Sequence, residues 1–167
     1  MDEGRERLEA DAFVAGQGLL LLALAAPSTA PRWRVPRPVQ RAALGLSAVG
    51  LGGMLVAASG LGKGLTASPL PNAAAQLRTG GLYSRIRHPM YSGLLLFAAG
   101  RVVACSSPVR LAALGALTVL LARKARWEER HLVERFPDYA RYADATPRFV
   151  PALRFHRSPG TGRPWLV

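Results

Sequence analysis

The sequence predicts an all-α integral membrane protein with about four transmembrane helices. The last two helices form a C-terminal hairpin, which is followed by a cytosolic amphipathic helix and a short tail. Hydrophobic residues make up 50% of the 167 residues and aromatic residues only 7%, a composition that suits helices packed closely in lipid. The arginines lie between the apolar runs, as expected where loops face anionic headgroups.

The chain is strongly basic, with a formal net charge of +12. Such a charge suits nucleic acid, an anionic membrane surface or an acidic ligand. The apolar runs favour membrane lipids as partners and argue against nucleic acid. Cys105 is the single cysteine, so the chain can form neither an internal disulfide nor a multi-cysteine metal site, and we expect no metal.

The N-terminal region begins with a polar, mostly acidic segment at 1–11 and continues with an uncharged run at 12–26. This run is short for a span, but a helix beginning near Leu8 is long enough to cross. A cleaved signal sequence is the alternative, and the acidic start argues against it. The prolines of 27–41 predict a loop or surface segment, with Trp33 as an interfacial anchor.

The run at 42–62 is the clearest predicted span, because it holds 21 residues without a charge. Its glycines predict a close-packing helix face. A glycine-rich phosphate cradle is the functional alternative, but no Gly-Lys-Ser/Thr sequence follows. Residues 63–82 read as a loop, with a short interfacial helix expected from Ala73 to Leu77.

Residues 89–122 hold two apolar runs, and the best fit is a helical hairpin that turns near Ser106 to Pro108. Arg101 and Arg110 would flank this turn and extend to the far interface. The alternative for Arg101 is an intramembrane ligand contact. The hairpin places both of its basic ends on one side, which the positive-inside rule makes cytoplasmic. A span at 42–62 then places the four arginines of 27–41 on the opposite side, against that rule, so either the first apolar run does not span normally or the larger basic segments decide the orientation. We expect four membrane helices with the N-terminus in the cytoplasm.

The chain becomes polar after the hairpin. Arg123 to Phe136 predicts an amphipathic helix, Asp138 to Tyr142 reads as helical, and Arg148 to Pro151 reads as extended. The tail at 152–167 is rich in proline and glycine and is expected to be mobile.

Two polar elements carry the chemistry: Arg87-His88-Pro89-Met90-Tyr91 at a helix start, and Glu128-Glu129 beyond the hairpin. Either element alone is explained as an interfacial anchor or a solvated helix face. The hairpin brings them to one membrane face, where they would form a pocket. Carboxylates suit an amino group or ribose hydroxyls, arginine suits a carboxylate, and tyrosine faces attract a sulfonium cation.

These residues resemble the signature of the isoprenylcysteine carboxyl methyltransferase family and related membrane phospholipid methyltransferases. The resemblance lies in five segments, 77–83, 87–93, 127–132, 136–142 and 148–151. It predicts a catalytic core at 77–151, preceded by N-terminal membrane helices and loops at 1–76. Pro137 departs from the pattern, because many relatives carry glycine there.

The resemblance implies methyl transfer from S-adenosylmethionine to a lipophilic small-molecule or lipidated acceptor at the cytosolic membrane face. The residues it implies near the cofactor are Tyr83, His88, Tyr91, Glu128 and Glu129. The candidate catalytic residues are Arg87, Arg126 and Arg148, the last two as groups that orient a carboxylate acceptor. A carboxylate acceptor needs no base, whereas an amine acceptor needs one, either His88 or a glutamate.

Two other functions compete with methyl transfer. A membrane sterol- or lipid-type reductase that uses NADPH shares an Arg-His-Pro-x-Tyr element, which here spans Arg87 to Tyr91. A small membrane scaffold would use the polar cluster only as an anchor. The preference for arginine over lysine suggests a bacterium with GC-rich coding, and hence the inner membrane as the location.

Overall fold

The structure is a computed structural model, and it describes residues 3–26, 33–66, 68, 70 and 76–151. Within these ranges the chain is helical, without strands. The α-helices are α1 (Glu3–Ala25), α2 (Arg37–Leu61), α3 (Pro89–Cys105), α4 (Pro108–Arg135) and α5 (Tyr139–Ala145). Two short 3-10 helices, η1 (Gly62–Gly64) and η2 (Gly81–Ser84), lie between α2 and α3.

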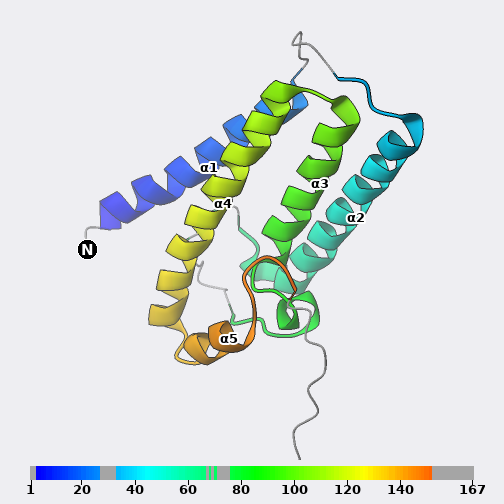
Figure 1. The fold of residues 1–167 in the computed structure, drawn as a ribbon. Coiled ribbons are helices and arrows are strands. Elements are labelled where there is room, and N and C mark those ends of the chain that lie inside the picture. Colours follow the sequence, from blue (N-terminus) through cyan, green and yellow to red (C-terminus); the bar gives the residue numbers. More distant parts are fainter. Residues whose placement is uncertain (1–2, 27–32, 67, 69, 71–75, 152–167) are drawn as a thin grey trace, which may run out of the picture.

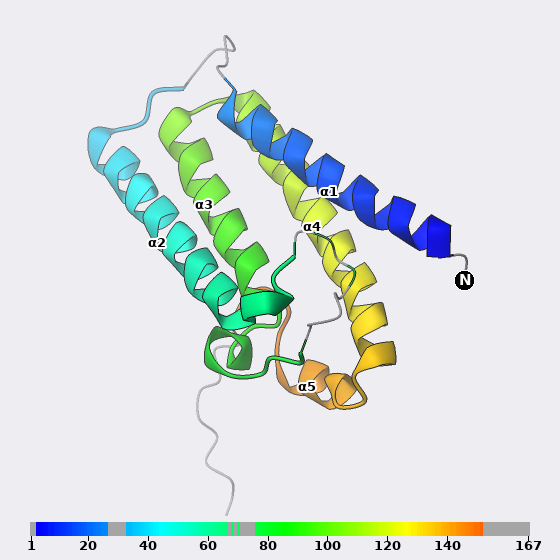
Figure 2. The same cartoon turned by 180° about the vertical axis from the view of Figure 1, so that it is seen from behind.

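The four long helices form one bundle (Figure 1). Helix α3 lies between α2 and α4, and α1 packs along α4. Seen from behind, the loops between α2 and α3 gather with α5 at one end, opposite the α3–α4 turn (Figure 2). The predicted helical hairpin is therefore present, and both of its open ends lie at the α5 end of the bundle.

The first two helices are longer than the apolar runs that predicted them. Helix α1 begins at Glu3, within the polar start of the chain. Helix α2 begins at Arg37. Residues 37–41, which were expected to belong to the loop over 27–41, are therefore helical. Prolines fit there because Pro38 occupies the first turn of α2, where its missing N–H has no intrahelical partner to lose.

The α2–α3 interface is built on glycine. A Cβ placed on Gly50 would lie 2.5 Å from the Phe97 backbone nitrogen, and one on Gly100 would lie 2.3 Å from the Ala43 carbonyl oxygen. The close approach lets the Ser47 hydroxyl donate to the Phe97 carbonyl at 3.1 Å. The predicted close-packing face is thus confirmed at these positions, as expected for helices joined through small residues.

The hairpin turn falls where the sequence predicted it, between Cys105 and Pro108. Ser106 closes α3 in the left-handed conformation, with φ 53°. The expectation for Arg110 is wrong. Its side chain is buried and donates to the Ala26 carbonyl at 2.8 Å, so it caps the C-terminal end of α1, where a cation is favoured. Arg101 is exposed near the turn, as predicted.

Helix α4 runs without a break from the hairpin turn to Arg135. The predicted amphipathic segment from Arg123 is therefore the second half of a 28-residue helix and not a separate element. Its buried Trp127 lies against α1, where the indole N–H donates to Glu9 at 2.9 Å. A single rigid helix thus connects the hairpin turn to the residues of the site.

In the part of the chain that the structure describes, two helices are long and apolar enough to cross a membrane, α1 and α2. Helix α3 is apolar but has only 17 residues. Both spans leave large aliphatic side chains exposed, including Leu19 at 68% and Val49 at 67%. A water-soluble fold would bury such surface, so the bundle is suited to lipid.

Two expectations lie outside the described residues. The short helix expected from Ala73 to Leu77 falls largely there, and so does the mobile tail at 152–167.

Candidate active site

The two polar elements of the sequence meet at the α5 end of the bundle. His88 precedes α3, whose first residue is Pro89, and Glu128 and Glu129 lie in the last turns of α4. Side-chain hydrogen bonds join the two elements directly, including one of 2.9 Å between His88 Nε2 and Glu129 Oε1. The predicted juxtaposition of the two elements is confirmed.

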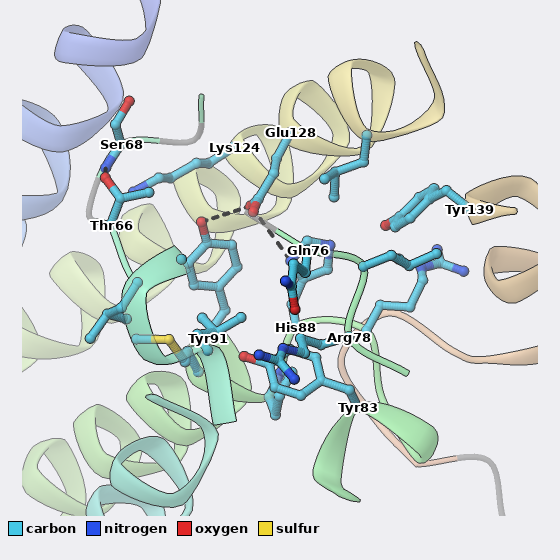
Figure 3. A pocket seen from close by; sticks show the side chains of 18 of the residues that line it. Thr66, Ser68, Gln76, Arg78, Tyr83, His88, Tyr91, Lys124, Glu128 and Tyr139 are labelled. Carbon is cyan, nitrogen blue, oxygen red and sulfur yellow. Dashed lines mark hydrogen bonds and ion pairs between the residues drawn. The ribbon is translucent and has the colours of Figure 1, made fainter. Parts of the chain in front are cut away.

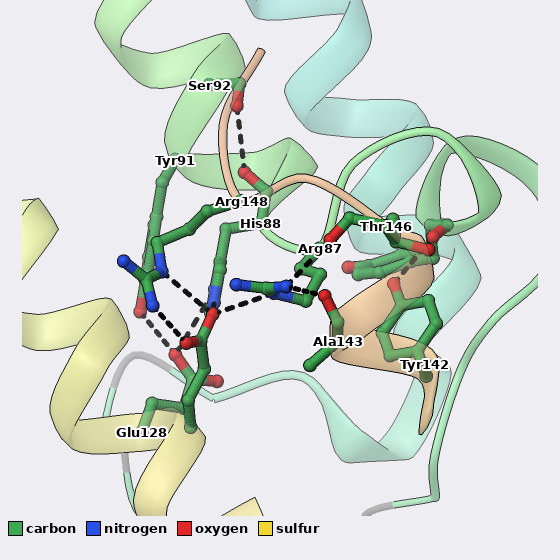
Figure 4. A network of polar contacts seen from close by, with 11 residues as sticks. Arg87, His88, Tyr91, Ser92, Glu128, Tyr142, Ala143, Thr146 and Arg148 are labelled. Atoms are coloured by element: carbon green, nitrogen blue, oxygen red, sulfur yellow. Dashed lines mark hydrogen bonds and ion pairs between the residues drawn. The ribbon is translucent and has the colours of Figure 1, made fainter. Parts of the chain in front are cut away.

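Glu129 is the centre of a cationic cluster, whose Arg87, His88 and Arg148 are labelled in Figure 4. Besides His88, Arg87 donates through Nε at 3.0 Å and Arg148 donates through Nε at 3.0 Å and Nη2 at 2.5 Å. The carboxylate is only 12% exposed. An ionised carboxylate accepts hydrogen bonds only, so Nε2 of His88 carries the proton of that bond.

The chain that follows α5 is hydrogen-bonded to the segment that carries this cluster. The backbone N–H groups of Arg87 and His88 donate to the carbonyls of Pro147 and Arg148 at 2.9 and 3.1 Å. The Ser92 hydroxyl donates to the Phe149 carbonyl at 2.7 Å. The segment predicted to be extended therefore runs beside the start of α3 and closes the site from the C-terminal side.

Arg87 also holds α5. Its guanidinium donates to the carbonyls of Ala143 and Thr146 at the C-terminal end of that helix. A cation is favoured at this end because the last helical carbonyls lack intrahelical partners. Arg87 therefore links α5 to Glu129, and its expected catalytic function stays a prediction.

Glu128 belongs to a second group, on the inner side of the site. It accepts from the Tyr91 hydroxyl at 3.0 Å, and His88 Nδ1 lies 3.7 Å from it. The His88 and Tyr91 rings are stacked, with centroids 5.3 Å apart. Figure 3 shows Tyr91 and Glu128 beside one another within the pocket.

The adjacent glutamates have opposite pKa shifts. Burial raises the pKa of Glu128 above its usual range, and the charge of His88 and the hydrogen bond from Tyr91 offset only part of this effect. Burial would also raise the pKa of Glu129, but hydrogen bonds from His88 and Arg148 hold it well below that range. The two neighbouring carboxyl groups thus lie in different electrostatic environments.

A cavity of about 480 Å³ opens beside Glu128, within the size range of small-molecule sites. Its polar lining includes Tyr83, His88 and Tyr91, and its apolar lining includes Met54 and Leu94 in the interior of the bundle. Figure 3 shows that Thr66, Ser68, Gln76 and Arg78, from the loop before α3, also line it. The cavity therefore presents both polar and apolar side chains to a ligand.

Tyr83 stands at the edge of this cavity, where its hydroxyl donates to the Ala57 carbonyl at 3.4 Å. Burial, together with the charge of Glu128 and the neighbouring Tyr142, raises the pKa of Tyr83 to about 12. Its hydroxyl therefore stays protonated at neutral pH. The Tyr142 hydroxyl donates to the Tyr83 carbonyl at 2.6 Å and ties α5 to the same wall.

Several lining residues were not predicted as site residues, among them Gln17, Lys124 and Tyr139. Lys124 is 2% exposed and donates to the Gln17 amide oxygen at 2.8 Å. The available signal was a lysine close to the end of an apolar run, in a chain with only one other lysine, Lys63. Tyr139 is 3% exposed, and its hydroxyl has no hydrogen-bond partner among the described residues. A buried donor in a cavity wall suits a ligand.

Arg126 and Arg148 lie apart from this cavity. Both line a second one, of about 740 Å³, between α4, α5 and the N-terminal half of α1. Residues two apart on a helix do not share a face, so Arg126 projects away from Glu128. Arg148 lies against Glu129 instead. Their expected function of orienting an acceptor stays a prediction.

The sequence matches the phospholipid methyltransferase family over residues 40–139, more than half of the chain. The chain belongs to the phospholipid methyltransferase family. The resemblance noted in the sequence is confirmed, and the match begins at residue 40, upstream of the core expected at 77–151.

Two curated relatives are also similar. The cobalt-zinc-cadmium resistance protein CzcN of Cupriavidus metallidurans is 39% identical over 93 residues, which are 54% of this chain and 41% of that protein. The nickel-cobalt-cadmium resistance protein NccN of Alcaligenes xylosoxydans xylosoxydans is 37% identical over 90 residues, which are 53% and 42%. The chain thus spans about two fifths of each relative.

Proposed function

We propose that this membrane methyltransferase-family protein transfers a methyl group from S-adenosylmethionine to a lipophilic acceptor at the cytoplasmic edge of the bacterial inner membrane. The observation that carries the proposal is the cavity of about 480 Å³, which is lined both by Glu128, His88 and Tyr91 and by apolar residues of the bundle. Such a cavity suits a polar methyl donor and an apolar methyl acceptor at once.

The lining residues fit the donor. The Glu128 carboxylate and the unpartnered Tyr139 hydroxyl suit amino and ribose groups, and the faces of Tyr83 and Tyr91 suit a sulfonium cation. S-adenosylmethionine, when bound, supplies an activated methyl group. The protein then has to align the acceptor with that methyl group and exclude water.

The acceptor class is proposed from the cations and bases in the cavity. Arg78 and Lys124 line it, and each can orient the carboxylate of a prenylcysteine-like or other lipid-like acceptor. An amine acceptor would have to lose a proton first. Glu128, whose pKa is raised, is then a better base than Glu129, which is held ionised by its cationic partners.

We further propose that α1, α2, α3 and the first half of α4, up to residue 122, all cross the membrane, with the N-terminus in the cytoplasm. Helix α3 is shorter than a solitary span, but its neighbours in the bundle can shield its ends, and a short span is tolerated at a modest cost per ångström of mismatch. The site then faces the cytoplasm.

The names of the two relatives describe resistance to metals. Metal binding by this chain has no comparable support, since no group of three or more His, Cys, Asp or Glu side chains suited to a metal is found among the described residues. The names therefore do not change the proposed reaction, and they leave the acceptor open.

The test is titration of the full chain, purified in detergent, with S-adenosylmethionine and separately with NADPH. We expect binding of S-adenosylmethionine only. Tyr91→Phe removes the 3.0 Å hydrogen bond to Glu128, and we expect affinity to fall about tenfold, the effect of one hydrogen bond to a charged group. Glu134→Gln, on the exposed side of α4, is the matched control.

Transfer of a radiolabelled methyl group into extracted lipids, prenyl-cysteine analogues and membrane proteins then identifies the acceptor. Binding of NADPH alone would support the reductase instead. If Tyr91→Phe and Glu128→Gln bind S-adenosylmethionine as the control does, the cluster is a structural anchor and the proposed site is wrong.

A further inference from the structure

The second cavity is lined by positively charged side chains that have no function in the proposed reaction. It lies at the same end of the bundle as the first and is lined by α4, α5 and the N-terminal half of α1. Three exposed arginines line it from α4: Arg123, Arg126 and Arg130. Their spacing of three and four residues places them on one face of the helix.

No described residue forms a hydrogen bond or ion pair with the side chain of any of these three arginines. The two carboxylates in the cavity wall accept hydrogen bonds from other residues. Glu129 accepts from Arg87, His88 and Arg148, and Glu9 accepts from the Trp127 indole at 2.9 Å. The α4 face thus has three positive charges without a counterion in the part of the chain that the structure describes.

The cavity floor is apolar. Phe13 of α1 packs on Trp127 of α4, with ring centroids 6.2 Å apart, and Val133 adds an aliphatic edge. Lining of this kind suits a ligand that presents both an anionic group and hydrocarbon. A small hydrophilic anion would make no contact with the apolar side chains of the cavity floor.

Toward the hairpin turn, the same face of α4 presents apolar side chains in place of arginines. Positions four, seven and eleven residues before Arg123 are Val119, Ala116 and Ala112, and all three are exposed. One helix face therefore presents guanidinium groups at the site end and then an exposed apolar stripe in the part of α4 proposed to cross the membrane. This order matches a phospholipid, with its headgroup at the interface and its acyl chains beyond.

We propose that the arginine face of α4, defined as Arg123, Arg126 and Arg130, binds the phosphate headgroup of an acidic membrane phospholipid, whose acyl chains lie along Val119, Ala116 and Ala112. Guanidinium forks pair with phosphate oxygens in a bidentate manner. The site is separate from the methyl-transfer cavity and does not depend on the reaction proposed for it.

The test uses the full chain in detergent and native mass spectrometry with added dioleoyl phosphatidylglycerol, dioleoyl phosphatidylcholine or inorganic phosphate. The variant is Arg123→Gln/Arg126→Gln/Arg130→Gln. The control, Arg34→Gln/Arg41→Gln/Arg101→Gln, removes the same charge from three exposed arginines elsewhere. Thermal unfolding of both variants checks that they are folded, and Arg126→Gln alone serves if the triple variant is unstable.

We expect phosphatidylglycerol to bind more tightly than phosphatidylcholine, and its affinity to fall at least about tenfold in the α4 variant, given the interfacial contribution of each arginine. The control should retain wild-type affinity. An equal loss in both variants would mean that only net charge matters and would overturn the proposal. Displacement of the lipid by inorganic phosphate at similar concentration would also overturn it, because the site would then recognise a free anion.

Discussion

Glu129 illustrates at the residue scale how one side chain can organise a site. It accepts hydrogen bonds from Arg87, His88 and Arg148 while only 12% exposed. Removing its charge would leave these donors clustered without a counterion. Removing one partner of a buried ion pair destabilises a protein far more than replacing both partners. We therefore expect a substitution of Glu129 to act first on the stability of the fold and only then on the reaction.

We expect Glu129→Gln to lower the free energy of unfolding by about 3 kcal/mol, the lower range for loss of one partner from a buried ion pair. Chemical unfolding in mild detergent measures it. The exposed Glu134→Gln should stay within about 0.5 kcal/mol of wild type. Equal stability of the two variants would show that the cluster is not held by this carboxylate.

The same carboxylate sets a pH dependence. The folded-state pKa of Glu129 lies below its usual range, so its stabilising effect is present above its unfolded pKa of about 4.3 and is lost as the pH falls below that value. Wild type should therefore lose more stability than Glu129→Gln between neutral and acidic pH. Parallel pH profiles for the two proteins would contradict this assignment.

At the element scale, the α2–α3 pair shows how glycine sets the distance between helices. Gly50 lies against the backbone of α3, whereas Gly52, two residues along, has no atom within 4 Å of the position of an added Cβ. The two glycines share a helix and a sequence context but face different surroundings. A substitution at each position separates packing from the intrinsic effect of removing glycine.

Gly50→Ala should be strongly destabilising, because its Cβ would lie 2.5 Å from the Phe97 nitrogen and 2.7 Å from the Gly93 carbonyl oxygen. The helices would have to separate, and we expect a loss of about 2 kcal/mol, within the range for overpacking. Thermal unfolding in detergent gives the comparison. Gly52→Ala should be neutral or stabilising, since alanine favours the helix. Tolerance of Gly50→Ala would mean that α2 and α3 are not in close contact.

At the scale of the whole molecule, the bundle places its polar chemistry at one end and its exposed aliphatic surface along the sides. The hairpin turn and Trp33 lie at the other end, where the backbone N–H of Trp33 donates to the Ser106 carbonyl at 3.2 Å. If the bundle crosses the membrane as proposed, the two ends face different compartments.

Cysteine labelling tests this orientation. In a Cys105→Ser background, Arg85→Cys lies near the site and Arg34→Cys near the hairpin turn, and both positions are exposed. A membrane-impermeant maleimide should label Arg85→Cys only in inverted vesicles and Arg34→Cys only in intact spheroplasts. Labelling of both from the same side would contradict the crossing of α2.

Much of this arrangement could be predicted from the sequence, because charge-free runs and prolines mark helices and turns locally. The meeting of His88 with Glu129 followed from the hairpin alone. The partnership of Gln17 with Lys124 did not, since it depends on α1 packing against α4, which no local pattern encodes. The direction of Arg126 was missed for a related reason, because proximity in sequence does not determine the helix face.

The backbone pairing of Arg87 and His88 with Pro147 and Arg148 has a consequence for biosynthesis. If the bundle crosses the membrane as proposed, helices α1 to α4 can insert while the ribosome is still at work, since domains and segments fold in the order of their synthesis. The site, however, lacks one wall until residues 147–149 have been translated. A chain released after α4 but before these residues would be a helical bundle without a closed pocket, so capacity for the proposed reaction would arise only once residue 149 has been added.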